Sequence, residues 1–214
     1  MNARQVQQMF LCVAEKMVVS EEFLTEIDNK IGDGDHGIGM AIGFKGVYQE
    51  LENKTYTYVN EVFHAIGMTM LCVMGGASGV LFGTVFISGI VNYPEKKEFV
   101  LEDFANIYVK SLNALKKRGK AQVGDKTMID ALEPACLGLK KAAEEGKSLH
   151  EGFAYAAAEA KRGMEYTKEC KARFGRAKYY GEKAIGLQDA GATSVYLIFQ
   201  AMSDWVNENI SKEA

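Results

Sequence analysis

The chain has 214 residues, of which 28 are acidic and 25 basic, and this mild negative charge argues against a nucleic-acid partner. Its length supports one domain, residues 1–214, with a substantial core. Four scattered cysteines without a CxxC pair, and an N-terminal segment without the apolar region of a signal peptide, lead us to expect a cytoplasmic protein with reduced thiols.

Apolar residues recur with helical spacing along most of the chain, through residues 6–17, 104–115, 149–169 and 192–209. The apolar run 68–91 contains five glycines, so it predicts two buried helices around a turn and not a membrane span. Pro94 is predicted to end a helix, and Pro134 to kink one from residue 127 to about residue 145. Strand alternation is not seen, so periodicity predicts an all-α fold of about eight helices.

An acidic segment between residues 28 and 37 contains Asp28, Asp33, Asp35 and His36, among glycines that we expect to keep it out of any helix. Clustered carboxylates repel each other unless a cation lies between them, so the segment indicates a hard metal ion, and a solvated polar turn stays open as the alternative. An EF-hand starting at Asp33 fails, because Phe44 falls where calcium needs a bidentate Glu. Magnesium needs fewer carboxylates, and these could hold one ion or two.

A glycine-rich segment, residues 75–79, precedes the apolar run of a buried helix. Such a turn presents free backbone N–H groups and the positive end of the helix dipole to an anion. Ser78 could be the N-cap of this helix or donate its hydroxyl to a phosphate oxygen. Tight packing between helices would explain the same small residues.

Two segments partly match well-known motifs but lack a required feature of each. Residues 119–127 resemble a Walker A loop, but Asp125 separates the second glycine from Lys126 and no strand precedes the segment. Residues 76–80 lack the spacing of a nucleophile elbow, and His64 and His150 have the surroundings of ordinary helix residues. The sequence therefore supports neither a P-loop nor a serine hydrolase.

A third glycine cluster, residues 186–194, precedes the last apolar helix and follows the basic stretch 173–178. The guanidinium of Arg176 suits phosphate recognition. Asp189 would either cap the following helix or pair with that arginine.

The segments IGDGDHG, GGASGVLFGT, GDKTMIDAL and GLQDAGATS, in this order, resemble the signature segments of the nucleotide-binding (L) subunit of dihydroxyacetone kinase. The resemblance implies an antiparallel eight-helix barrel with the nucleotide site in loops at one end. It implies that three carboxylates bind two magnesium ions, which hold the phosphates of ADP or ATP: Asp28, Asp33 and Asp35. Residues implied to line the nucleotide site are His36, Gly37, Ile38, Gly39, Ala77, Ser78, Gly119, Met128, Arg176, Asp189 and Gly191.

The last loop departs from the family pattern, because Leu187 and Ala190 stand where relatives usually have His and Pro. The loss of Pro relaxes the turn, and the loss of His removes a polar group near the nucleotide. The intact acidic and Gly-Gly-Ala-Ser-Gly segments keep the expectation of nucleotide binding, whereas substrate identity stays open.

The resemblance also implies a phosphotransferase in which this chain supplies only the nucleotide half. A separate subunit would hold dihydroxyacetone, and a phosphohistidine carrier protein of the phosphotransferase system would recharge bound ADP to ATP. Three alternatives stay open: the nucleotide half of an ATP-dependent triose or tetrose kinase, a nucleotide-bound regulator that docks on a transcription factor, and a metal-dependent phosphatase. A homodimer is compatible with each, and neither nucleic acid nor membrane is expected as a partner.

Overall fold

The computed structural model describes residues 1–211, and these residues contain nine α-helices, one 3-10 helix and no β-strand. The all-α prediction is therefore confirmed. Only an isolated antiparallel bridge joins Asn2 to Glu98. The helices in chain order are α1 (Ala3–Val19), α2 (Glu21–Ile31), α3 (His36–Glu52), α4 (Val59–Val73), α5 (Gly76–Ile87), α6 (Leu101–Gly119), α7 (Ile129–Glu144), α8 (Leu149–Tyr166), the 3-10 helix η1 (Arg176–Ala184) and α9 (Ala190–Asn209).

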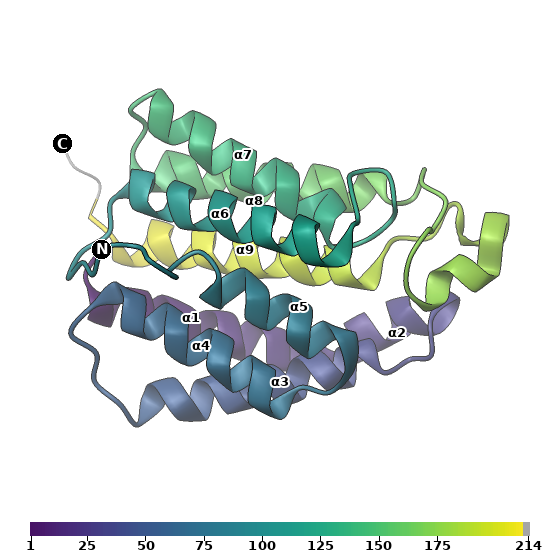
Figure 1. The fold of residues 1–214 in the computed structure, drawn as a ribbon, viewed down its shortest axis with the longest axis horizontal. Helices are drawn as coiled ribbons and strands as arrows, with labels where there is room; N and C mark the ends of the chain where they lie inside the picture. Colours follow the sequence, from purple (N-terminus) through teal and green to yellow (C-terminus); the bar gives the residue numbers. More distant parts are fainter. Residues whose placement is uncertain (212–214) are drawn as a thin grey trace.

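Eight of these helices form a closed ring. Starting from α1, each contacts the next in the order α3, α4, α5, α6, α7, α8 and α9, and α9 returns to α1. Neighbours in the ring run antiparallel, because each connection reverses the direction of the chain (Figure 1). α2 lies outside the ring against α3, α9 and η1. The expected eight-helix barrel is present, with α2 as an additional helix at its end.

Aromatic side chains fill the interior of the ring. The Phe10 and Phe63 rings meet edge to face with centroids 5.3 Å apart, and Phe104 meets Phe153 in the same way at 5.2 Å. These four rings are almost completely buried. Because a packed aromatic core leaves no room for a polar ligand, binding at the ends of the helices is favoured over binding inside the barrel.

All four motif segments lie at one end of the barrel, the right-hand end in Figure 1. The connections at this end are residues 32–35 between α2 and α3, residues 74–75 before α5, residues 120–128 between α6 and α7, and residues 167–189 between α8 and α9. The opposite end carries the connections 53–58, 88–100 and 145–148 and the N terminus. An up-and-down ring thus gathers loops that are far apart in the sequence.

Of the two prolines, Pro94 departs from the prediction, whereas Pro134 lies within a helix over the predicted region. Pro94 does not end a helix, because α5 ends at Ile87 and a turn follows. Pro134 lies inside α7 and lacks the N–H that the Asp130 carbonyl would accept in a regular helix. Gly163 of α8 lies against this carbonyl, and a Cβ at position 163 would come within 2.0 Å of its oxygen. The absence of a side chain on α8 therefore allows α7 and α8 to approach closely.

The apolar run 68–91 forms parts of α4 and α5, as predicted. Within residues 1–211, no helix combines the length and the hydropathy needed to cross a bilayer.

Candidate metal and phosphate site

The acidic segment is more helical than the sequence suggested. Asp28 lies in the last turn of α2, Asp35 is the N-cap of α3, and His36 is the first residue of that helix. Only residues 32–35 are outside helices, so the expectation that glycines keep the whole segment out of helices is wrong. The physical reason is that glycine disfavours helix interiors but is well tolerated at helix ends.

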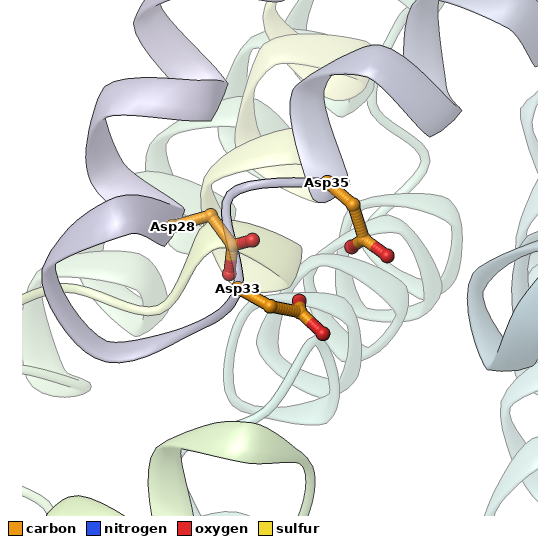
Figure 2. Close-up of side chains that lie close together, drawn as sticks. All are labelled: Asp28, Asp33 and Asp35. Atoms are coloured by element: carbon orange, nitrogen blue, oxygen red, sulfur yellow. The ribbon is translucent and has the colours of Figure 1, made fainter.

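The short turn brings the three predicted carboxylates together (Figure 2). One carboxylate oxygen from each of Asp28, Asp33 and Asp35 lies within 4.8 Å of the others. Asp28 is half-buried, and its Oδ2 accepts hydrogen bonds from the backbone N–H groups of Gly34 at 2.9 Å and His36 at 3.3 Å. Asp33 and Asp35 are exposed at the mouth of the turn. The turn thus fixes one carboxylate through the backbone and leaves two facing solvent.

The electrostatics of the cluster favour a bound cation. Desolvation, followed by the negative charges of Asp33 and Asp28, raises the pKa of Asp35 above its usual value. A divalent cation among the three carboxylates would remove this repulsion. The donor set consists of carboxylate oxygens only, which suits a hard ion such as Mg²⁺, and the exposed side leaves coordination positions for water and phosphate oxygens.

Arg176 completes the acidic cluster from a distant part of the chain. Its Nε donates to Oδ2 of Asp33 at 2.8 Å, although the two residues are 143 positions apart. The hydroxyl of Tyr180 in the same segment donates to the carbonyl of Gly32 at 3.3 Å. The basic stretch therefore lies against the acidic turn, and Arg176 pairs with Asp33 and not with Asp189.

The start of α5 forms the second part of the site. Gly75 is the N-cap of this helix and Gly76 has φ = +66°, a conformation that favours glycine. Ser78 is thus the third residue of the helix, so the N-cap alternative predicted for it is wrong, and donation of its hydroxyl to a phosphate oxygen stays a prediction. Ala77 is exposed and Ser78 half-buried, with the first-turn amides of α5 available to an anion.

His36 links three helices at this end of the barrel. Its Nε2 lies 2.8 Å from Oγ of Ser194 in α9, and its ring centroid lies 6.4 Å from that of Phe82 in α5. Burial lowers the pKa of His36 below its usual value, although the charge of Asp28 opposes the shift. The imidazole is therefore neutral near pH 7 and acts as a hydrogen-bonding group and not as a charge.

The last loop is organised by Asp189, which is the N-cap of α9. Its Oδ2 accepts a hydrogen bond from the N–H of Ala192 at 2.7 Å, so the capping prediction is confirmed. Burial raises the pKa of Asp189 to about 7. Gly191 packs beside Met128, since a Cβ at position 191 would lie 3.4 Å from the Cβ of that methionine. Two predicted residues from separate loops are thus neighbours.

The remaining predicted residues divide into two groups. Gly119 ends α6 and lies beside Leu81 of α5, which places it at the same end as the acidic turn. Gly37 instead faces α2, where a Cβ would lie 2.2 Å from the Glu21 carbonyl oxygen, so its role in this structure is close helix packing. Ile38 is exposed and Gly39 half-buried on the outer side of α3.

Three polar residues at this end were not predicted as site residues. Asp130 is fully buried and accepts hydrogen bonds from the N–H groups of Gly124 at 2.6 Å and Thr127 at 2.7 Å. Lys126 is buried as well, and its Nζ donates to the carbonyl of Thr167 at 2.6 Å. Asp125 accepts from the N–H of Gln122 at 2.9 Å. The near-match to a Walker A loop was the available signal, but this lysine binds backbone carbonyls, which agrees with rejecting a P-loop.

Comparison with known proteins places these observations in a family. Residues 30–204 match the family model described as the DAK2 domain. The chain is 37% identical over 182 residues to an Escherichia coli protein described as "PEP-dependent dihydroxyacetone kinase, ADP-binding subunit DhaL", covering 85% of this chain and 87% of that protein. A Listeria innocua protein described as "PEP-dependent dihydroxyacetone kinase 1, ADP-binding subunit DhaL" is 36% identical over 188 residues, covering 88% of this chain and 89% of that one.

A solved structure shares the fold. The dihydroxyacetone kinase from C. freundii, described in complex with AMP-PNP and Mg²⁺, superposes with a TM-score of 0.74 at 25% identity. The match covers 93% of this chain but only 33% of the larger kinase, so this chain corresponds to about a third of that protein. With a family match over most of its length and a relative of similar size at 37% identity, the chain belongs to the DAK2 domain family.

Proposed function

We propose that this chain is the ADP-binding subunit of a phosphoenolpyruvate-dependent dihydroxyacetone kinase. The observation that carries the proposal is the meeting of Asp28, Asp33 and Asp35 with Arg176 and an open helix start at one end of the barrel. Similarity along nearly the whole chain to ADP-binding subunits of such kinases supports the same conclusion.

In this proposal the three carboxylates hold magnesium, as two ions, against the phosphates of ADP or ATP. Magnesium supplies neutralisation of the phosphate charge, which phosphoryl transfer needs more than covalent chemistry. The amides of Ala77 and Ser78 at the start of α5 bind phosphate oxygens. Arg176, whose Nε donates to Asp33, would add a positive charge beside the phosphates.

The other predicted residues shape the nucleotide site around the phosphates. His36, held by Ser194, offers a neutral ring that positions the nucleotide without repelling the metal. Gly119, Met128 and Gly191 provide small or apolar surface beside it. Ile38 and Gly39 extend the site along the outer side of α3.

The acceptor chemistry belongs to partner proteins. Dihydroxyacetone is held on a separate kinase subunit, and a phosphohistidine carrier protein of the phosphotransferase system passes phosphoryl to the bound nucleotide. The proposed site on this chain is rich in groups that suit phosphate. Its histidine, His36, is already hydrogen-bonded to Ser194, so it is not free to activate an acceptor. The assembly works in the cytoplasm, and docking on a transcription factor or formation of a homodimer is compatible with it.

Reconstitution tests the proposal. The purified chain, ATP, Mg²⁺ and dihydroxyacetone in a coupled assay should give no turnover above blank, whereas the substrate subunit and the phosphorylated carrier should restore it. Mass spectrometry of denatured protein should detect ADP after incubation with ADP and Mg²⁺. Turnover by the chain alone would refute the split arrangement, and failure to bind ADP would refute the site. If the complete system accepts a tetrose but not dihydroxyacetone, the kinase class stands and the substrate assignment is wrong.

A further inference from the structure

The segment that carries Arg176 is a long excursion, residues 168–186, between α8 and α9. Its two ends meet at a narrow neck. The N–H of Gly186 donates to the carbonyl of Lys168 at 2.7 Å, and the N–H of Asp189 donates to Oγ1 of Thr167 at 3.0 Å. These bonds connect the end of one helix to the start of the next. The position of Arg176 therefore depends on how firmly the neck is held.

A buried lysine from another loop lies at this neck. Lys126 is 1% exposed, and its Nζ donates to the Thr167 carbonyl at 2.6 Å and to the Leu187 carbonyl on the other side. Both acceptors are neutral carbonyl groups, which compensate a buried ammonium less well than a paired carboxylate does. The Thr167 carbonyl lies at the C-terminal end of α8, where the helix dipole attracts a positive charge.

We propose that Lys126 is a positioning residue for nucleotide binding: by bridging the two sides of the neck, it holds the excursion so that Arg176 lies over the acidic turn. This role rests on the proposed function, because it acts through Arg176 on the phosphates. It also gives a role to a lysine in a Walker-like segment whose ammonium is engaged by two backbone carbonyls.

The connection that carries Lys126 is itself fixed on both sides. Asp130 of α7 accepts from the N–H groups of Gly124 and Thr127, which flank the lysine. Asp125 fastens the excursion a second time, because its carbonyl accepts from the N–H of Arg173 at 3.1 Å and its Oδ1 lies 3.3 Å from Nε of that arginine. The connection that carries Lys126 is therefore attached to α7 through Asp130. We call the two hydrogen bonds from Lys126 Nζ to the Thr167 and Leu187 carbonyls the clamp.

Apolar packing holds the excursion only weakly by comparison. A separate small cluster, consisting of Ile31, Ala172, Ala177, Ala184 and Leu187, joins it to the end of α2. Three of these five side chains are alanine methyl groups, so the cluster buries little apolar area. A segment with few apolar contacts opens readily unless polar contacts restrain it. Polar contacts, including the hydrogen bonds at the neck and the Arg173–Asp125 pair, therefore restrain the segment that carries Arg176.

Two matched variants test the clamp. Lys126→Met keeps the apolar stem and removes the ammonium. Lys120→Met is the control, because Lys120 lies in the same connection with φ = +60°, close to the +59° of Lys126, but is exposed. Hydrogen exchange of the nucleotide-free protein should be about tenfold faster across residues 168–189 in Lys126→Met, with α3 to α6 unchanged and the control like the wild type.

A double-mutant cycle with Arg176→Ala measures whether Lys126 acts on ADP binding through Arg176. A purely structural role of Lys126 would leave the effect of Arg176→Ala on ADP binding unchanged. In the wild-type background, Arg176→Ala should weaken Mg²⁺-dependent ADP binding by about tenfold, whereas in Lys126→Met it should weaken binding by less than about twofold. Equal losses in both backgrounds, or unchanged exchange across the neck, would overturn the proposal.

A second variant keeps the test decisive if Lys126→Met does not fold. Thr167→Val is isosteric and removes the hydroxyl that accepts from Asp189, so it should give the same faster exchange and the same non-additivity with Arg176→Ala. Additive losses there would overturn the proposal. If the wild-type protein binds no ADP, the proposed function fails, and hydrogen exchange alone then decides whether Lys126 clamps the neck.

Discussion

Without ligand, the Asp35→Asn variant should be more stable than the wild-type protein. With Mg²⁺ and ADP present, it should be less stable than the wild-type protein. Asp35 is the cleanest of the three acidic positions to change. Among residues 1–211, no backbone amide or cationic side chain donates to the carboxylate of Asp35, whereas that of Asp28 accepts from two backbone N–H groups and that of Asp33 accepts from Arg176. The substitution therefore removes a charge from the cluster without leaving a hydrogen-bond donor unpaired.

The magnitude follows from the geometry. Carboxylate oxygens of the three residues lie within 4.8 Å of one another. In water, two unit charges at that separation repel by about 1 kcal/mol, and salt and the nearby Arg176 reduce the sum over two neighbours to about that value. A gain of about 1 kcal/mol corresponds to a rise in melting temperature of about 2–4 °C for a chain of this size.

Bound ligand should reverse the order. At a concentration about a hundred times its dissociation constant, a ligand stabilises the native protein by about 2.7 kcal/mol, and Asp35→Asn should lose most of this gain. The assay is thermal unfolding at pH 7 and low salt, once with a chelator and once with Mg²⁺ and ADP. Glu26→Gln on the exposed side of α2 is the matched acid-to-amide control. If Asp35→Asn keeps wild-type ligand stabilisation, the carboxylates do not share a cation.

Three further outcomes are expected. Burial raises the pKa of Asp189 to about 7, so the stability that this group contributes is present below its unfolded pKa of about 3.9 and is lost as pH rises toward 7. Asp189→Asn, which can still cap Ala192, should raise the melting temperature more at pH 8 than at pH 5, and an equal effect at both would contradict the shift. Gly163→Ala should cost about 3 kcal/mol in unfolding experiments, because its Cβ meets the Asp130 carbonyl at 2.0 Å; an unchanged denaturation midpoint would mean that α7 and α8 are less close. Calorimetric titration with ADP should show at least about tenfold weaker binding without Mg²⁺ than with it, and equal affinities would exclude a metal-dependent site.

The sequence alone determined the helical class and much of the chemistry. Helical spacing is a local property, since residues three or four apart share a face, so the helices around Val13, Leu112 and Ile198 could be predicted without knowledge of their neighbours. The acidic segment could be found because carboxylates so close in sequence must be close in space. Asp189 as an N-cap is equally local, because a cap bonds an amide three residues away.

Local detail was less predictable where glycine was involved. Gly75 and not Ser78 caps α5, and the acidic segment lies partly within helices. A glycine can end a helix, begin one or allow two helices to touch, and its sequence context does not distinguish these roles. Gly37 illustrates the point, because only its position against the Glu21 carbonyl shows that it serves helix packing.

Tertiary structure decided which distant residues meet. Arg176 reaches Asp33 across 143 positions and His36 reaches Ser194 across 158, and both pairs exist because eight antiparallel helices close into a ring whose loops gather at one end. The role of Lys126 depends on the same closure, since its acceptors lie on another connection. Spacing along the chain fixes which face of a helix a residue occupies, but a partner across the barrel is fixed only when all the helices pack together.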